Sequence, residues 1–290
     1  MSARPQKPSA LQRNLLFVAV GAVFLWAVVG VGIRWDRLFN LPERLLDIFG
    51  RMFLPPDWSF LPVAVEAMME SLAMAWIGTV IGAALSLPMG FLAARNVSGG
   101  FFSAIARFIL NAIRAVPELI LAIVVFVPVA GLGPMAGALA IGVHSIGTLG
   151  KLSSEAVESI DPGPVEAARA TGASRLAQQR WGVIPQVLPE IVAFWLYRFE
   201  INLRAAAVLG IVGAGGIGAL LSNTLTYRRW DSAGMTVLVV IIGTIIVDQA
   251  SGWLRRRIIE GSDGPPPGEE ALVELRRTGR SEADTASTVG

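Results

Sequence analysis

Long apolar stretches separated by short polar segments run along most of this chain. Residues 15–33 carry no charge and approach the roughly 20 residues that a helix needs to cross a bilayer. Further apolar regions follow at 71–94, from about 101 to 129, at 135–150, at 191–221 and at 234–247. The region 135–150 is rich in Gly and Ala, which let helices approach closely. This pattern predicts an all-α membrane protein with about six transmembrane helices.

The first apolar stretch follows three basic residues, Arg4, Lys7 and Arg13, as it would in a secretory signal peptide. It is longer than the about 7 to 15 apolar residues of such a peptide, and it lacks a small-residue cleavage pattern. We therefore interpret 1–14 as a cytoplasmic N-terminus and 15–33 as a first transmembrane anchor that is retained.

Charges alternate with apolar residues at helical spacing in residues 34–63. An external helix lying in the membrane interface would have this pattern, and so would a loop helix packed on its neighbours. The last segment, 258–290, is polar and rich in Pro, and we expect a disordered cytoplasmic tail there.

The composition supports the membrane assignment and excludes several kinds of site. Hydrophobic residues make up 53% of the chain and charged residues 16%, against about 25% charged in soluble domains. The chain has no Cys and one His, so we expect no disulfide, thiol nucleophile or metal site, and no cofactor bound by this chain. A net charge of +2 does not predict a nucleic-acid partner.

The distribution of Lys and Arg predicts the orientation of the helices. One side bears the N-terminus, Arg95, the polar segment 151–190 and the arginines at 255–257. The opposite side has fewer basic residues, namely Arg34, Arg37, Arg44, Arg51, Arg228 and Arg229. The positive-inside rule therefore places both termini and the segment 151–190 in the cytoplasm of a multi-pass membrane protein.

A glycine-rich stretch at 210–218 contains the spacing G-x-G-x-x-G, which binds dinucleotides when it joins a strand to a helix. Asp231 even lies near the place of the expected acidic residue. The apolar surroundings do not fit a strand–helix unit, so we expect no dinucleotide. The glycines instead permit close backbone approach or a helix break, which is tolerable at membrane depth only where protein or a water-filled path covers the freed polar groups. These glycines are Gly210, Gly213, Gly215, Gly216 and Gly218.

Ionisable residues inside apolar stretches usually face a protein interior or a cavity. Arg198, Glu200, Asn202 and Arg204 lie in one such stretch. Glu200 and Arg204 are spaced to pair at i, i+4, which would leave Arg198 the freer cation. Arg198 or Arg204 could line a path through the membrane, where an arginine supplies positive charge and hydrogen-bond donors, or the arginines could belong to structural ion pairs.

Two weaker candidates for the path lie in the third and fourth apolar regions. Arg114 and Glu118 also have i, i+4 spacing, but near a span end their side chains could simply reach the interface. His144 and Ser145 lie among Gly and Ala, where a His either bonds across helices or serves as a ligand group.

The polar segment contains the stretch DPGPVEAARATGASRLAQQRWGVIP. Asp161 can cap a helix, Pro162 and Pro164 suit its first turn, and Gly172 suits its end. These residues predict a short cytoplasmic helix followed by a turn, which could be a solvated loop or a docking element.

This stretch resembles the EAA loop of ABC importer permeases. The shared residues are Glu166, Ala167, Ala168 and Gly172, followed by GVIP, although Gly182 and Ile184 stand where the family has Ile and Leu. The stretches RAVPELILAIVVF, GLGPMAGALAIGVHSIGTLGKLSSEAVE and FWLYRFEINLRAAAVLGIVGAGGIG resemble the permeases of phosphonate-type importers. The resemblance covers about 65–255.

The resemblance implies a type I ABC importer permease (MetI-like) fold at 64–257, with the EAA coupling loop at 151–190. It implies a bacterial cell membrane, a second permease chain, identical or related, and an external substrate-binding protein. It also implies two copies of a cytoplasmic ATPase, which use ATP and Mg. The residues expected to couple to the ATPase are Glu166, Ala167, Ala168, Arg169, Gly172 and Ala173.

The chain itself lacks an ATP site of the P-loop type. Its Gly150-Lys151 pair has Ser145 in place of the first Gly and Leu152 after the Lys, so we expect no enzyme activity from this chain alone. A gradient-driven transporter or channel would need repeats or a carboxylate relay, and only Glu200 lies deep in an apolar stretch. A permease for another small solute and an intramembrane enzyme acting on lipid phosphate remain alternatives. Phosphonate, phosphate and phosphite are not distinguished by the sequence.

Overall fold

The computed structural model describes residues 10–32 and 40–260, which form helices and the turns between them. The predicted cytoplasmic N-terminus and the predicted disordered tail lie outside the described residues, except for 10–14 and 258–260. The chain divides into two units, Met1–Leu54 and Pro55–Gly290.

The first unit contains two helices, α1 (Ala10–Gly30) and α3 (Leu41–Phe53). From Leu15 to Gly30, α1 is apolar on all sides and most of its residues are exposed, as in a helix surrounded by lipid. α3 begins with Pro42 in its first turn and carries a charged face, on which Arg51 bonds Asp47 at 3.0 Å. The helix predicted within 34–63 is confirmed, and its place in the membrane interface stays a prediction.

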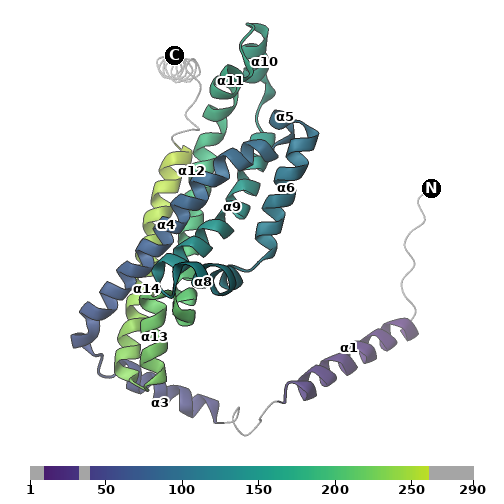
Figure 1. Ribbon diagram of the computed structural model, residues 1–290. Coiled ribbons are helices and arrows are strands. Elements are labelled where there is room, and N and C mark those ends of the chain that lie inside the picture. Colours follow the sequence, from purple (N-terminus) through teal and green to yellow (C-terminus); the bar gives the residue numbers. More distant parts are fainter. Residues whose placement is uncertain (1–9, 33–39, 261–290) are drawn as a thin grey trace, which may run out of the picture. The chain divides into compact units, whose positions relative to one another are not determined.

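The second unit is a bundle of long helices with short helical connections (Figure 1). The long helices are α4 (Leu61–Ala93), α6 (Gly100–Ala115), α9 (Pro134–Glu158), α12 (Ile184–Leu209), α13 (Gly216–Thr226) and α14 (Trp230–Glu260). The connections are η1 (Trp58–Phe60), α5 (Arg95–Ser98), α7 (Glu118–Ile120), η2 (Leu121–Phe126), α8 (Val127–Ala130), α10 (Pro162–Ala170), α11 (Arg175–Gln178), η3 (Gln179–Val183) and η4 (Gly210–Ala214).

Small residues bring α4 and α9 together at the centre of this bundle. Gly78, Gly82 and Gly90 of α4 face α9, and a Cβ added at Gly78 would lie 2.7 Å from Cγ2 of Ile141. Such close approach favours association of helices in lipid, where burial of apolar surface contributes little to the free energy of association. α12 packs against both helices, and α6 and α14 flank them.

Four helices among the described residues are long and apolar enough to cross a membrane, or up to six if each of two bent pairs counts as one span. The bent pairs are α6 with the helical turns after it, at 80°, and α12 with α13, at 57°. This agrees with the prediction of about six transmembrane helices.

Several helices extend past the apolar stretches that predicted them. α4 begins at Leu61 instead of near 71, and its 33 residues span roughly 50 Å. α9 continues to Glu158 and α12 begins at Ile184. Within the polar segment 151–190, only 159–183 therefore connects the two long helices, and this connection contains α10, α11 and η3. Hydropathy marks the part of a helix that lies in lipid, whereas backbone hydrogen bonding continues into the polar region.

Candidate functional site

Arg198 of α12 lies at the centre of a polar network inside the bundle. Its side chain is buried, and its Nε donates a hydrogen bond to Ser145 Oγ at 3.0 Å. Nη2 lies 2.8 Å from Nδ1 of His144 and 3.7 Å from Oε2 of Glu118. The guanidinium is therefore held by α9 and by the short helix α7.

Asn202 extends the network by one turn of α12. Its fully buried amide donates hydrogen bonds to Thr79 Oγ1 at 2.9 Å and to Ser145 Oγ at 3.1 Å. The network thus joins α4, α7, α9 and α12 around the predicted residues Arg198, Asn202, His144 and Ser145. The sequence analysis did not single out Thr79, because a hydroxyl in an apolar stretch is common in helices of any role.

The predicted pair between Glu200 and Arg204 is wrong. Glu200 Oε1 instead accepts a hydrogen bond from Arg255 at 3.0 Å, and Arg204 bonds Asp248 at 3.0 Å. Both partners lie on α14, which packs beside α12, so tertiary partners replace the local i, i+4 partner. The sequence analysis missed Asp248 as a partner, because spacing along one helix carries no information about the next.

The i, i+4 spacing of Arg114 and Glu118 also gives no pair. α6 ends at Ala115 and α7 begins at Glu118, after Pro117 and a bend of 80°. Pro117 cannot continue the helix, and the turn directs Glu118 to Nδ1 of His144 at 3.5 Å.

The glycine-rich stretch breaks the helix. A helix break was one of the two predicted alternatives, and close backbone approach was the other. Val212 and Gly213 leave helical geometry, and Gly215 and Gly216 have φ of +81° and +65°. A side chain at Gly218 would collide with the backbone oxygen of Ala207, so close approach occurs as well. No strand is present in 10–32 or 40–260, so the stretch does not join a strand to a helix there.

The first turn of α13, after this break, is capped by α4. Gly216 N–H donates to Oε2 of Glu70 at 3.1 Å, and Ile217 N–H donates to Ser71 Oγ at 2.9 Å. The first N–H groups of a helix have no partner within it, and a carboxylate there is favoured by the helix dipole. The sequence analysis missed Glu70, because the apolar stretch that it recognised begins one residue later.

The short helix α10 has defined caps at both ends, as predicted. Asp161 accepts a hydrogen bond from Gly163 N–H at 2.9 Å. At the other end Gly172 has a φ of +74°, its N–H bonds the Arg169 carbonyl at 3.0 Å, and Ala173 N–H bonds the Ala168 carbonyl at 3.2 Å. This is a Schellman ending, which Gly favours because a positive φ costs it little.

Gln186 of α12 holds α10 in place. Its amide oxygen accepts from Asp161 N–H at 3.0 Å, and its amide nitrogen donates to the Asp161 carbonyl at 3.2 Å. Gly182 in η3 supports the same packing, because a Cβ there would lie 3.0 Å from Cα of Val165 in α10. The departure from the EAA pattern at Gly182 therefore allows close contact with α10, and Gln186 is a positioning residue that sequence reasoning missed.

Most of the predicted coupling residues are exposed on α10 and the turn after it. Glu166, Ala167, Arg169 and Gly172 are exposed, while Ala168 and Ala173 are partly buried. Two large apolar side chains, Leu176 and Trp181, are also exposed in the same loop, at 76% and 70%. α10 and α11 lie at one end of the second unit (Figure 1), so this surface is accessible to another protein.

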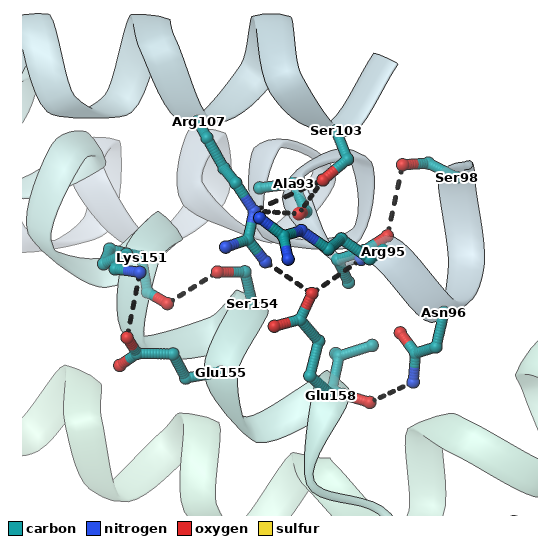
Figure 2. A network of polar contacts seen from close by, with 12 residues as sticks. Ala93, Arg95, Asn96, Ser98, Ser103, Arg107, Lys151, Ser154, Glu155 and Glu158 are labelled. Carbon is teal, nitrogen blue, oxygen red and sulfur yellow. Dashed lines mark hydrogen bonds and ion pairs between the residues drawn. The ribbon is translucent and has the colours of Figure 1, made fainter. Parts of the chain in front are cut away.

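A second polar network fixes the start of this loop (Figure 2). Glu158, the last residue of α9, accepts hydrogen bonds from the Arg107 guanidinium and, at 2.7 Å, from Arg95 N–H. Asn96 Nδ2 donates to the Val157 carbonyl at 2.6 Å. The point at which the chain leaves α9 for α10 is thereby tied to α5 and to the middle of α6, and Arg107 Nε also donates to the Ala93 carbonyl at the end of α4, at 2.9 Å.

The described residues contain no group of three or more His, Asp or Glu side chains that could hold a metal ion. The side chains that gather inside the bundle are mainly hydrogen-bond donors with one cation and one carboxylate. Such a set can bind an anion or hold helices together.

Comparison with known proteins gives a consistent result. Residues 86–260 match the family described as the inner membrane component of binding-protein-dependent transport systems. The chain is 42% identical to the phosphate-import permease PhnE of Mycolicibacterium smegmatis over 261 residues, which are 89% of this chain and 48% of that protein. It is also 42% identical to the phosphite transport permease PtxC of Stutzerimonas stutzeri, over 70% of this chain and 74% of the relative.

Solved ABC transporters share the fold. An inward-facing crystal form of the methionine transporter MetNI superposes with a TM-score of 0.60 at 22% identity, covering 70% of this chain and 99% of that one. A bacterial alginate transporter gives a TM-score of 0.53 at 15% identity, covering 85% and 96%. The chain spans about half the length of the Mycolicibacterium relative and three quarters of the Stutzerimonas relative, 48% and 74%.

Proposed function

The chain belongs to the family of binding-protein-dependent transport inner membrane components, and from this premise we propose that it is the membrane-spanning subunit of an ATP-driven importer for a phosphate-like oxyanion. The exposed helix α10, capped at both ends and held by Gln186, is the observation that carries the proposal. A rigid exposed helix can receive a displacement at one end and pass it on to the bundle.

The coupling step would use this helix as the contact with a separate ATPase. Glu166 and Ala167 are exposed on α10, in the same loop as the exposed apolar side chains Leu176 and Trp181. A small apolar centre with a polar rim is typical of an interface between proteins. The network around Glu158 would carry movement of the loop to α4, α6 and α9 together.

The substrate class is supported by the names of the relatives and by the chemistry inside the bundle. Relatives at 42% identity are named for phosphate and phosphite import. Arg198, Asn202 and Ser145 provide a cation and hydrogen-bond donors of the kind that tetrahedral oxyanions require. Phosphonate, phosphate and phosphite share this chemistry, so the proposal extends to the class and leaves selection among them to the binding protein.

The complete transporter would need further chains. We infer a second permease chain, identical or related, two copies of a cytoplasmic ABC ATPase that use ATP and Mg, and an external binding protein that delivers the substrate. Both termini and the loop with α10 would lie in the cytoplasm, because the basic residues concentrate on that side.

Copurification tests the proposed coupling surface. The tagged full chain is purified from its native membrane in mild detergent, together with the variants Glu166→Lys and Glu190→Lys, and the copurifying proteins are identified by mass spectrometry. Glu190→Lys makes the same charge change at an exposed residue outside α10. We expect a P-loop ATPase with the wild type and with Glu190→Lys, and its loss with Glu166→Lys.

Two results would count against the proposal. Equal recovery of the ATPase with both variants would remove α10 from the contact. Absence of any ATPase from the wild type, with uptake that persists when the cell's ATP is exhausted, would favour the gradient-driven transporter instead.

A further inference from the structure

A polar pocket of about 360 Å³ lies between α5 and the loop that contains α10 and α11. Three arginines line it, Arg95 of α5, Arg169 of α10 and Arg175 of α11, together with the amide side chains of Asn96, Gln178 and Gln179. None of its lining residues is acidic. The pocket therefore concentrates positive charge and hydrogen-bond donors without an internal counterion.

The guanidinium groups of the pocket arginines form no hydrogen bond or salt bridge within the described part of the chain. The side chains of Arg169 and Arg175 make no hydrogen bond or ion pair with residues in 10–32 or 40–260. Arg95 donates its backbone N–H to Glu158 and also interacts electrostatically with that carboxylate, which the guanidinium of Arg107 bonds directly. Arg169 and Arg175 thus have no side-chain partner among the described residues, and the Arg95 guanidinium has only its electrostatic interaction with Glu158.

The N-terminus of α6 adds to the positive potential. Gly99, which lines the pocket, is the N-cap of this 16-residue helix and has a φ of +77°. No side chain caps α6, so its first N–H groups have no partner within the helix and its dipole favours an anion there. Backbone donors and arginines together match the oxygens of a phosphate group.

The surroundings of the pocket indicate what kind of molecule would carry a phosphate group bound there. The pocket lies where the 33-residue apolar helix α4 ends and α6 begins, which is the level of lipid headgroups if α4 spans the membrane. The first turns of α6 expose Phe101 at 73%, Phe102 at 63% and Phe108 at 74%. An acyl chain could lie along these rings while its phosphate occupies the pocket.

We propose that this pocket binds the phosphate headgroup of an anionic phospholipid, through Arg95, Arg169, Arg175 and the N-terminus of α6. The lipid would bridge the end of α4 and the coupling loop. Its binding does not depend on which solute the protein transports.

Thermal unfolding in detergent provides the test. The full chain is titrated with dioctanoyl phosphatidylglycerol, with dioctanoyl phosphatidylcholine or with sodium phosphate, and the Tm is measured at each concentration. The double variant Arg169→Gln, Arg175→Gln removes two charges from the pocket. Arg180→Gln is the matched control, because Arg180 is an exposed arginine of the same loop that stacks on Trp181 and does not line the pocket.

We expect phosphatidylglycerol to raise the Tm in a saturable way, and phosphatidylcholine to have little effect. The double variant should need roughly 30-fold more phosphatidylglycerol for the same shift, whereas Arg180→Gln should follow the wild type. Equal shifts in the wild type and the double variant would overturn the pocket assignment. A full shift with sodium phosphate at the same concentration would overturn the lipid source and assign the pocket to a free anion.

Discussion

At the scale of single residues, the main question is whether Arg198 binds substrate or only holds the bundle. Its guanidinium bonds Ser145 and His144 and lies near Glu118, so it does not stand as an isolated charge. The Glu118 side chain remains 29% exposed, so the network is open on one side. Arg198 itself is buried, so an anion would have to reach its guanidinium from this open side of the network.

A double-mutant cycle separates the two roles of Arg198. We expect Arg198→Gln to lower the free energy of unfolding by roughly 1–3 kcal/mol, because Glu118 and Ser145 lose a charged partner. Adding Glu118→Gln should recover part of that loss, with a coupling energy on the order of 1 kcal/mol, because the uncompensated carboxylate is removed. Unfolding in detergent and uptake in cells are measured for each variant.

The transport readout decides between the alternatives for Arg198. If Arg198 meets the substrate, the double variant recovers stability and still fails to transport. Uptake that returns together with stability would show a purely structural ion pair. Arg204→Gln is the control on the same helix, because Arg204 bonds Asp248 on α14, and its cycle with Glu118→Gln should show no coupling.

At the scale of elements, the break between α12 and α13 depends on glycines and on α4. Gly216 has a φ of +65°, its N–H is bonded by Glu70, and a side chain there would collide with Ser71 Oγ. The break therefore positions α13 against α4 through backbone geometry as well as side-chain packing.

Substitution of Gly216 tests this account of the break. We expect Gly216→Ala to lower the free energy of unfolding by about 1–3 kcal/mol, from the left-handed backbone and the contact with Ser71. Gly252→Ala is the control, because no atom outside its own helix lies within 4 Å of the added Cβ, and it should be neutral or stabilising by up to about 1 kcal/mol. Equal effects of the two substitutions on Tm in detergent would mean that the break needs no glycine at 216.

At the scale of the whole molecule, the order of spans predicts which loops lie on each side. The turn after α10 and the turn between α13 and α14 are separated by the bent pair of α12 and α13. If this pair is one span, the two turns lie on opposite sides of the membrane. If α13 re-enters instead, both turns lie on the same side.

Cysteine labelling distinguishes these topologies, and the chain has no native Cys to give a background. We expect a membrane-impermeant maleimide to label Arg228→Cys in intact spheroplasts and to label Thr171→Cys only after the membrane is opened. Both residues are exposed in the folded chain, so access depends on the side of the membrane. Labelling of both variants in intact spheroplasts would contradict the predicted arrangement.

Local patterns were sufficient to predict much of the fold. Apolar length predicted the helices, and Asp161 and Gly172 predicted a short helix at α10, with Asp161 as its N-cap and Gly172 just after its C-cap, Thr171. The glycine-rich stretch predicted a helix break as one of two alternatives. These features are encoded within a few neighbouring residues, since hydropathy, capping and permitted backbone angles act over one or two turns.

The partners of the charged residues were decided by tertiary structure. Glu200 pairs with Arg255, Glu118 turns toward His144 and Arg198, and Glu70 caps a helix that begins 146 residues later. A side chain bonds whichever partner the packing of helices brings within about 3 Å, and spacing along one helix does not specify its neighbour. The sequence alone thus determined the helices, the capped helix α10 and the family resemblance, while helix packing determined the polar networks and the arginine pocket.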